Sequence, residues 1–171
     1  FLTSRKDIAR NINDEKLAGI NSPQVEFLGI LSGNYRKLSL TDDDKLEDKL
    51  PAPFRLKLKK GALIMMLKND SARRWANGTV GTVTKLNDTE LWVKINSDDI
   101  LVAKETWKEV EYVLNQETKQ IEEKITGQYT QYPVQLAFAM TIHKSQGKTF
   151  DKIVVDIGAG AFAHGQVYVA L

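Results

Sequence analysis

The segment from residue 54 to residue 114 constrains the fold most, because its apolar residues come in short runs separated by turn signals. In the first run, apolar residues alternate with Arg55, Lys57 and Lys59, which is the period of a half-buried strand. Asn77-Gly78 is a favoured hairpin turn. The expected strands cover residues 54–59, 62–67, 80–86, 91–95, 100–103 and 110–114. Several short strands with little helix between them predict a small antiparallel β-barrel.

Segments of mixed helix and strand pattern flank this barrel on both sides. On the N-terminal side, a strand is expected to end at Thr3, and a helix is expected to begin at Ser4 and to stop at Gly19. Ser4 is a favoured N-cap, and Asp7 stands three residues later, in capping-box position. The other elements expected on this side are strands over residues 25–30 and 37–40 and a helix from Thr41.

On the C-terminal side, strands are expected over residues 134–140 and 152–157, and a last helix is expected to begin near Gly165. Because the barrel stands between two such pieces, it is interpreted as an insertion. The predicted fold class is therefore α/β, with a partial parallel-sheet domain that a small antiparallel β-barrel interrupts. The predicted domains are residues 1–50 together with 116–171, and residues 51–115 for the barrel.

The composition excludes several kinds of site. The chain has 171 residues, no Cys and only two His, so disulfides, thiolate metal sites and His-rich metal sites are excluded. No segment is long and apolar enough to span a membrane, and no signal peptide is visible. We therefore expect a soluble cytoplasmic protein without a membrane partner. The chain starts without Met and ends within an apolar run, so it is expected to be a fragment of a longer protein.

The net charge of +2 conceals an uneven distribution. Residues 51–85 contain eight Lys or Arg and one Asp, whereas residues 86–123 contain ten acidic residues and four Lys. A basic block beside an acidic block fits a domain with one side suited to a polyanion. Two oppositely charged, solvated faces would give the same pattern, and charge alone leaves both interpretations open.

A cluster of polar side chains follows the expected strand over residues 134–140. Its hydroxyl, imidazole and ammonium groups are of the kinds that contact phosphate oxygens. Open α/β sheets bind ligands at the ends of their strands, so this cluster is the main candidate site. It consists of Thr141, His143, Lys144, Ser145 and Gln146, followed by Gly147.

Two nucleotide-binding motifs are only partly matched. Gly147-Lys148-Thr149 resembles the end of a P-loop, but the position five residues before Gly147 is Ile142 instead of the required glycine. The segment from Asp156 to Ala163 resembles a dinucleotide fingerprint, but only eight residues follow it, too few for the second strand and its acidic residue. Neither motif is accepted as a nucleotide site.

The same region resembles the C-terminal half of superfamily-1 DNA helicases of the RecD and PIF type. The resemblance rests on Gln131-Tyr132-Pro133, on the run from Leu136 to Gly147, and on Gly165 to Leu171. Barrel residues 59–70 and 77–83 agree with it, and Leu2 to Arg5 with Ile12-Asn13 is weakly similar to the family's fourth motif.

The resemblance implies a second RecA-like motor domain with an inserted Src-homology-type barrel. It implies that the parent protein is an ATP-dependent DNA helicase, which moves along single-stranded DNA while two motor domains close on ATP and Mg²⁺. The first motor domain, on the same parent chain, is an implied partner. The resemblance also implies an arginine after Leu171 that stabilises the transition state of ATP hydrolysis. The chain alone is therefore expected to bind no cofactor and to lack ATPase activity.

The resemblance also implies two sets of site residues. Hydroxyl, imidazole and ammonium groups would hold the DNA backbone, and the residues after them would face the nucleotide. The DNA-contacting set is Thr141, His143, Lys144 and Ser145. The nucleotide-cleft set is Gln146, Gly147 and Arg5.

The barrel adds Arg73, Arg74 and Trp75, which precede the Asn77-Gly78 turn. Two guanidinium groups beside an indole are able to hold phosphates and stack on bases. A solvated loop whose Trp75 covers the end of the barrel is an equal alternative. Trp92 and Trp107 are expected in the core or at a domain interface.

Two other functions remain as alternatives. The first is a non-enzymatic module, derived from a helicase, that binds nucleic acid or protein. The second is a dinucleotide-dependent enzyme, which would need the glycines at 158–160 to open a long helix.

Overall fold

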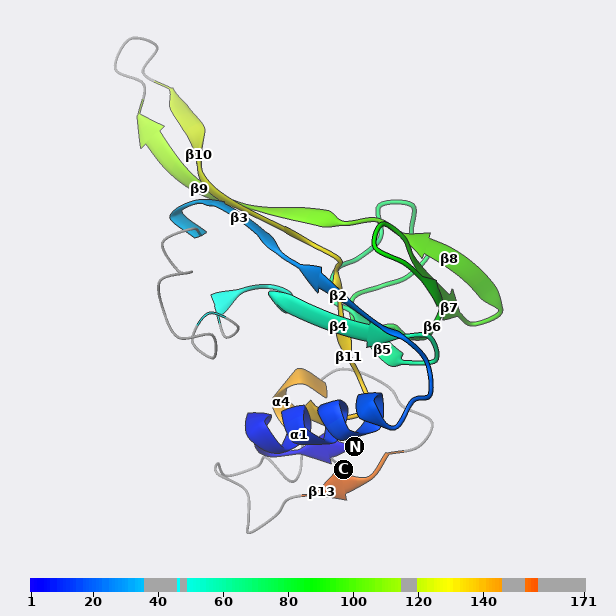
Figure 1. Cartoon of the computed structure of the whole chain (residues 1–171). Helices are drawn as coiled ribbons and strands as arrows, with labels where there is room; N and C mark the ends of the chain where they lie inside the picture. Colours follow the sequence, from blue (N-terminus) through cyan, green and yellow to red (C-terminus); the bar gives the residue numbers. More distant parts are fainter. Residues whose placement is uncertain (36–45, 47–48, 115–119, 146–152, 157–171) are drawn as a thin grey trace.

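The computed structural model describes residues 1–35, 46, 49–114, 120–145 and 153–156. The strand expected over residues 37–40, the start of the helix expected at Thr41 and the helix expected near Gly165 lie outside the described residues. The described part is mostly β, with antiparallel sheets and one small parallel sheet (Figure 1). The helices with described bounds are α1 (Lys6–Ala18) and the short α4 (Ile142–Ser145).

The strands fall into four sheets. The parallel sheet has the order β12 (Met140–Thr141), β1 (Leu2–Thr3), β13 (Val155–Asp156). The largest antiparallel sheet has the order β11 (Val134–Leu136), β5 (Leu63–Met66), β6 (Val80–Leu86), β7 (Leu91–Ile95), β8 (Asp98–Val102). A third sheet has the order β3 (Ile30–Gly33), β10 (Ile121–Gln131), β9 (Glu105–Leu114). The fourth pairs β2 (Gln24–Leu28) with β4 (Arg55–Lys59).

The expected short strands between residues 54 and 114 are present and antiparallel. Strand β4 has the alternation predicted from its sequence, since Leu56 and Leu58 are buried while Arg55 and Lys57 are exposed. The apolar sides of β4, β5, β6 and β7 enclose the largest core cluster, together with Tyr132 and Val134. Alternation therefore identified both the strands and the side that each one buries.

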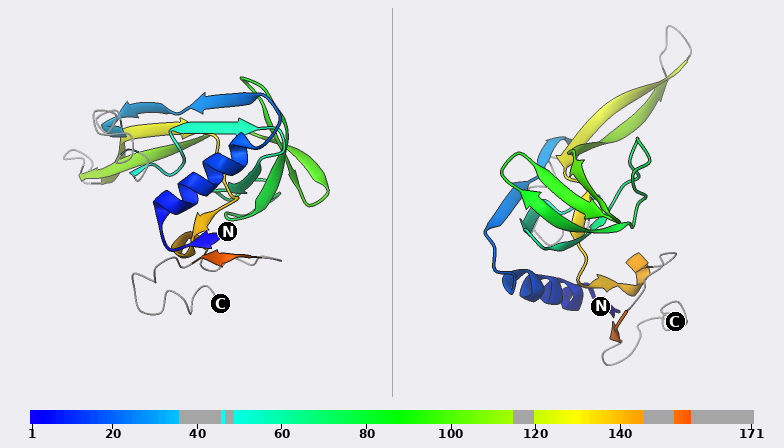
Figure 2. Two further views of the ribbon diagram at one scale, coloured as in Figure 1. Left: turned by 60° about the horizontal axis from the view of Figure 1, so that its bottom comes forward. Right: turned by 90° about the vertical axis from the view of Figure 1, so that its right-hand side faces the viewer.

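Strand pairing extends across both predicted domain boundaries. Strand β2 pairs with β4 across the boundary at residues 50 and 51. Strand β10 pairs with β9, and β11 with β5, across the boundary at residues 115 and 116. These pairs attach residues 24–33 and 121–136 to the β-rich body (Figure 2). The domain division itself stays a prediction.

The strand expected over residues 134–140 is instead two strands in different sheets. Strand β11 ends at Leu136, and the Ala137 N–H then donates to the Leu63 carbonyl at 2.9 Å. The chain next crosses to the parallel sheet, where Met140 is in register with Leu2 and Thr141 with Thr3. One continuous apolar segment therefore contributes strands to two sheets. The sequence pattern does not show where it divides. The strand expected over residues 152–157 is described only at Val155–Asp156.

The N-cap of the N-terminal helix lies one residue later than expected. Its N-cap is Arg5, in extended conformation, and the cap has no side-chain hydrogen bond. Ser4 is therefore not the cap, and Asp7 pairs with the Arg5 guanidinium instead of closing a capping box. The end was predicted correctly, because the Gly19 N–H donates to the Glu15 carbonyl at 3.0 Å. Ala9 and Leu17 are the buried residues of the helix.

Candidate nucleic-acid interface

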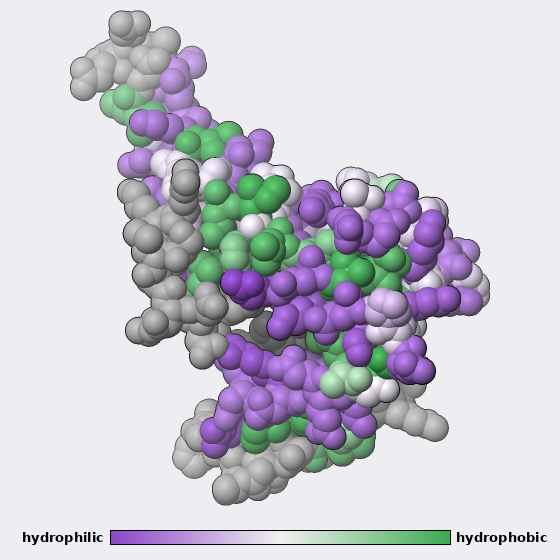
Figure 3. Space-filling view, viewed as in Figure 1, coloured by the Kyte–Doolittle hydropathy of each residue, from purple (hydrophilic) through white to green (hydrophobic). Residues whose placement is uncertain are grey.

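A cleft of about 680 Å³ lies between helix α1 and the strands β4 and β5. In Figure 3 it is a hollow between two hydrophilic bands. Four basic residues line it, and the only acidic residue in the described lining is Asp14. This excess of cations favours a polyanionic ligand. The basic residues are Lys6, Arg10, Arg55 and Lys57.

The cations come from both walls of the cleft. Lys6 and Arg10 are four residues apart on α1, so they lie on one face of the helix. Arg55 and Lys57 are two residues apart on β4, so they lie on one face of the strand. Arg55 also forms a long ion pair with Glu26 on β2, with 4.0 Å between Arg55 Nη1 and Glu26 Oε1. The two walls thus present opposed pairs of positive charges.

The floor of the cleft includes the end of the parallel sheet. Thr141 is the last residue of β12, is half-buried and lines the cleft. Thr3 on β1 and Asp156 on β13 hold the neighbouring register positions, so three parallel strands end side by side. This is where open parallel sheets place ligand contacts. The structure therefore brings predicted residue Thr141 to the edge of the basic cleft.

Asn13 fixes the chain just before Thr141. Its Nδ2 donates to the Ala139 carbonyl at 2.8 Å, and its Oδ1 accepts from the Ala139 N–H at 2.9 Å. Both atoms of the side-chain amide are thereby used on one peptide group. Helix α1 and the strand-end cluster are consequently held as one unit.

Ser145 occupies a different environment from the one expected of a DNA contact. It is buried, and its Oγ donates to the Ile142 carbonyl at 2.7 Å. A hydroxyl has one proton to donate, so Ser145 has none left for a phosphate while this bond persists. The DNA contact expected of Ser145 stays a prediction, and it would require the hydroxyl to exchange this bond within α4 for one to a phosphate.

The remaining cluster residues cannot all be placed. His143 and Lys144 lie in α4, directly after the strand that ends at Thr141, and their side chains lie outside the described part of the structure. Gln146 and Gly147 lie outside the described residues altogether. The roles expected for these four residues stay predictions.

Arg5, the expected nucleotide contact, pairs with its neighbour Asp7. Its Nε and Nη2 donate to the two carboxylate oxygens at 3.0 and 2.6 Å. This hydrogen-bonded pairing lowers the pKa of the Asp7 carboxyl and raises the pKa of Arg5. Both side chains are exposed, so the pair is accessible from solvent. Arg5 would have to exchange this carboxylate for a phosphate in order to bind nucleotide.

The loop from Asp70 to Trp75, between β5 and β6, is internally bonded. Arg74 donates from Nε and Nη2 to the Asp70 carboxylate at 2.8 and 2.7 Å, and these bonds lower the pKa of Asp70 to about 2. The Arg74 guanidinium also lies 4.6 Å from the Trp75 ring centroid. Arg73 is exposed and has a left-handed backbone, with φ of 59°.

Trp75 itself belongs to the core. It is only 9% exposed, and its Nε1 donates to the Lys68 carbonyl at 3.1 Å. This position fits the alternative interpretation, in which the indole covers the end of the predicted barrel. Base stacking on Trp75 stays a prediction, and it would require the ring to leave its core neighbours and the Arg74 guanidinium that lies over it.

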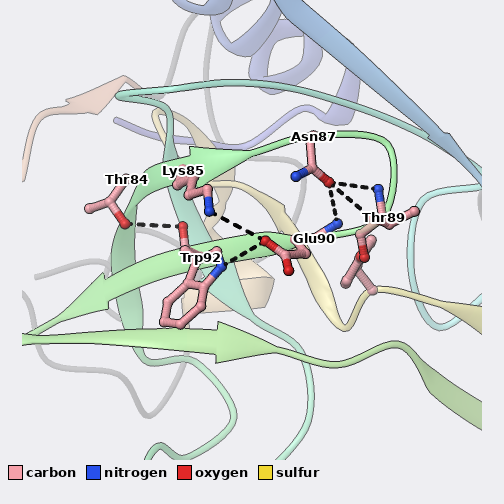
Figure 4. Close-up of polar contacts among 7 residues, drawn as sticks. Thr84, Lys85, Asn87, Thr89, Glu90 and Trp92 are labelled. Carbon is pink, nitrogen blue, oxygen red and sulfur yellow. Dashed lines mark hydrogen bonds and ion pairs between the residues drawn. The ribbon is translucent and has the colours of Figure 1, made fainter.

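The other two tryptophans differ from each other. Trp107 is half-buried and packs against the third core cluster, where its ring centroid lies 5.7 Å from that of Tyr129. Trp92 is half-buried on the β6–β7 hairpin, where its Nε1 donates to Glu90 Oε2 at 3.3 Å (Figure 4). Lys85 Nζ reaches the same oxygen at 3.5 Å, so Trp92 belongs to a surface network and not to the core.

Sequence reasoning did not select the four basic residues and Asn13 as members of one site. The spacing of Lys6 and Arg10, and the alternation at Arg55 and Lys57, were visible as local patterns. Their convergence depends on how α1 packs beside β4, which no local pattern encodes.

The described residues give no sign of two other kinds of site. No group of three His, Cys, Asp or Glu side chains among them is arranged to hold a metal ion. No helix in the described part of the chain has the length and apolarity needed to cross a membrane.

Comparison with known proteins finds relatives that align with nearly the whole of this chain. The family model described as "DNA helicase Pif1, 2B domain" matches residues 44–86. The ATP-dependent DNA helicase Pif1 of Bdellovibrio bacteriovorus is 39% identical over 171 residues, which cover 99% of this chain and 36% of that protein. The Campylobacter jejuni Pif1 is 32% identical, over 94% of this chain and 36% of that protein. The chain spans about a third of the length of these relatives.

Solved structures show the same correspondence. Unliganded Pif1 from Bacteroides sp superposes with a TM-score of 0.81 at 33% identity, over 99% of this chain and 36% of that one. Bacteroides Pif1 bound to single-stranded DNA gives a TM-score of 0.77 at 34% identity, over 99% of this chain and 37% of that one.

The shared fold and the residues matched define a region of a superfamily-1 DNA helicase. Within that superfamily, the chain belongs to the Pif1 family and corresponds to the region that contains the 2B domain.

Proposed function

We propose that the chain binds single-stranded DNA in the basic cleft, as part of an ATP-dependent DNA helicase. The observation that carries this proposal is the pair of opposed basic walls formed by α1 and β4. Cations spaced along two walls suit a phosphate backbone, because they contact it without selecting a sequence. The Bacteroides relative bound to single-stranded DNA, at 34% identity, supports the choice of ligand.

In this proposal, residues at the end of the parallel sheet contact the DNA in addition to the four basic residues of the cleft walls. The Thr141 hydroxyl, on the cleft floor, donates to a phosphate oxygen. His143 and Lys144, which follow in α4, contact neighbouring phosphates of the DNA backbone. Asn13 keeps this strand end in place through the Ala139 peptide. Arg73 and Arg74 extend the positive surface on the barrel, by charge and not by stacking on Trp75.

The proposed helicase assignment also includes a share of the ATP cleft. The parallel sheet would be part of a second RecA-like motor domain, and the antiparallel strands a Src-homology-type barrel. Gln146, Gly147 and Arg5 would face ATP, with Mg²⁺ and the other motor domain supplied by the rest of the parent chain. Bacteroides Pif1 in complex with ADP-AlF3 and single-stranded DNA, 33% identical, supports this assignment. The proposed location is the cytoplasm.

Fluorescence anisotropy with a labelled oligothymidylate tests the DNA site on the chain itself. Lys57→Ala and Arg10→Ala are each expected to weaken binding by about threefold to tenfold, because each removes a phosphate contact. Lys94→Ala is the matched control, since Lys94 is an exposed cation on β7 outside the cleft. Each cleft variant should also reduce the slope of log affinity against log salt by about one.

The result that would overturn the site is equal weakening by Lys94→Ala and by the cleft variants. Binding that does not depend on salt would also contradict it, since phosphate contacts release counterions.

A further inference from the structure

The β9–β10 hairpin projects from the body of the protein as an arm (Figures 1 and 2). Strand β3 covers β10 only from Gly127 to Thr130. Beyond that point, residues 110–114 pair with residues 121–125 and with no third strand in the described structure. We call this two-stranded part, residues 110–114 and 121–125, the arm.

One face of the arm is apolar and exposed. The register places Leu114 opposite Ile121, Tyr112 opposite Glu123, and Val110 opposite Ile125. Alternation puts these three rungs on a single face. Ile121 is 72% exposed and Tyr112 is 65% exposed, and the other three apolar residues are exposed as well. The face thus carries five uncovered apolar side chains.

The opposite face of the arm has a different character. Glu111 is opposite Lys124, and Val113 is opposite Glu122. Each of these rungs carries a charged residue, and Val113 is the single apolar residue in them, so the arm is amphipathic. A two-stranded hairpin is marginally stable alone in water, and its apolar face is the part that gains from being covered.

Among the described residues, the apolar face points away from the body of the protein. Towards the base of the hairpin, the core side of the sheet carries Trp107 and Tyr129, which pack against the third core cluster. Thr106 and Thr130 lie on the other side, which faces away from that cluster and continues into the apolar face of the arm. Another molecule can therefore approach this face without displacing the core.

We propose that the apolar face of the arm binds the same face of a second copy of this chain. The pattern of the three rungs is self-complementary. With a two-fold axis along the arm, β9 of one copy lies over β10 of the other. Leu114 then meets Ile121, Val110 meets Ile125, and the Tyr112 hydroxyl meets the Glu123 carboxylate.

The central rung, Tyr112 with Glu123, favours a second copy of the chain over other binding partners. Glu123 is the only charged group among the three rungs, and a copy of the chain supplies a matching donor, Tyr112, at the same level. Nucleic acid is disfavoured, because Glu111, Glu122 and Glu123 are acidic and would repel phosphates. The two-fold arrangement leaves both carboxylates hydrogen-bonded and all five apolar residues covered.

Sedimentation equilibrium of the chain over a range of concentrations tests the proposal. The expected result is a concentration-dependent rise from 19.3 kDa toward twice that mass. Ile121→Lys should raise the dissociation constant about tenfold or more, because it places a charge inside the interface. Val113→Lys makes a matched change on the opposite face of the same arm and should leave the dissociation constant unchanged. Circular dichroism checks that both variants keep the fold.

Cross-linking tests the orientation, and it is simple because the chain contains no cysteine. A mixture of Leu114→Cys and Ile121→Cys chains should form a mixed disulfide faster than either variant forms one with itself. A chain that stays at 19.3 kDa at the highest concentration overturns the proposal. So does dimerisation that Val113→Lys weakens as much as Ile121→Lys, or a mixed disulfide that forms no faster than the self-disulfides.

Discussion

Asn13 on helix α1 and Ala139, one residue before β12, are joined by two hydrogen bonds of 2.8 and 2.9 Å. The two residues are 126 positions apart in the sequence. An amide side chain is suited to this contact, because it donates to a peptide carbonyl and accepts from a peptide N–H at the same time. The pairing fixes the strand that ends in Thr141 against the helix that carries Lys6 and Arg10.

Replacing Asn13 should destabilise the chain and loosen the cleft. Asn13→Ala removes both bonds and leaves the Ala139 peptide without them, at a cost of about 1–3 kcal/mol of unfolding free energy. Urea unfolding followed by circular dichroism measures this loss. Asn11→Ala is the control, since Asn11 is exposed on the same helix and should change stability by less than about 0.5 kcal/mol. Equal effects of the two substitutions would contradict the importance of the pairing.

Gln131 is expected to be a second point of high sensitivity. Its side chain is fully buried, its Nε2 lies within 3.2 Å of the carbonyls of Phe27, Pro53 and Phe54, and its Oε1 accepts from the Tyr132 N–H. Gln131→Leu keeps the volume but leaves these backbone groups without their partner, so we expect a loss of about 2–3 kcal/mol in urea unfolding.

The control for Gln131 is Gln24→Leu, which makes the same change at an exposed position of β2. A loss at Gln131 no greater than at Gln24 would show that the buried amide has no special role.

Alanine substitutions at Gly33 and Gly61 distinguish the cost of backbone strain from the cost of a steric clash. Both have positive φ, of 58° and 91°. A Cβ on Gly33 would collide with the backbone of Thr126 and Gly127, whereas one on Gly61 would meet only Ile20 Cγ2 at 3.9 Å. Gly61→Ala should therefore cost about 1 kcal/mol from strain alone. Gly33→Ala should cost clearly more, by about 2 kcal/mol or above, because it adds the collision. Thermal unfolding of both variants measures the difference.

The Asp70–Arg74 pair should make the stability of the β5–β6 loop depend on pH. The pKa of Asp70 is lowered from 3.8 to about 2, chiefly by the hydrogen bond from the Arg74 side chain. The stability from this pair is fully present above pH 3.8 and is lost as the pH falls toward 2. Solvent near the pair screens it, so we expect less than about 1 kcal/mol. Asp70→Asn should flatten this part of the curve of unfolding free energy against pH.

Asp88→Asn provides the comparison for Asp70, because it changes an exposed carboxyl outside the loop. If both variants keep the slope of the unsubstituted chain between pH 5 and pH 2, the pair contributes nothing measurable.

The sequence alone determined the strands whose two sides differ in polarity. Alternation at residues 55–58 predicts β4 and its buried side, and Gly19 predicts the end of α1. These are local effects of side-chain period and backbone freedom, which a few neighbouring residues are enough to encode. The resemblance to superfamily-1 helicases was likewise carried by a continuous string of residues.

Tertiary structure decided which local elements meet. The run from residue 134 to residue 140 divides between two sheets because Leu63 and Asn13, distant in sequence, hydrogen-bond to Ala137 and Ala139. Contacts with distant segments likewise bury Trp75. They also bring the basic residues of α1 and β4 to one cleft. Contacts between distant segments depend on the packing of whole elements. The sequence therefore set the elements and the family, and only the folded chain assembled the cleft and left the arm uncovered.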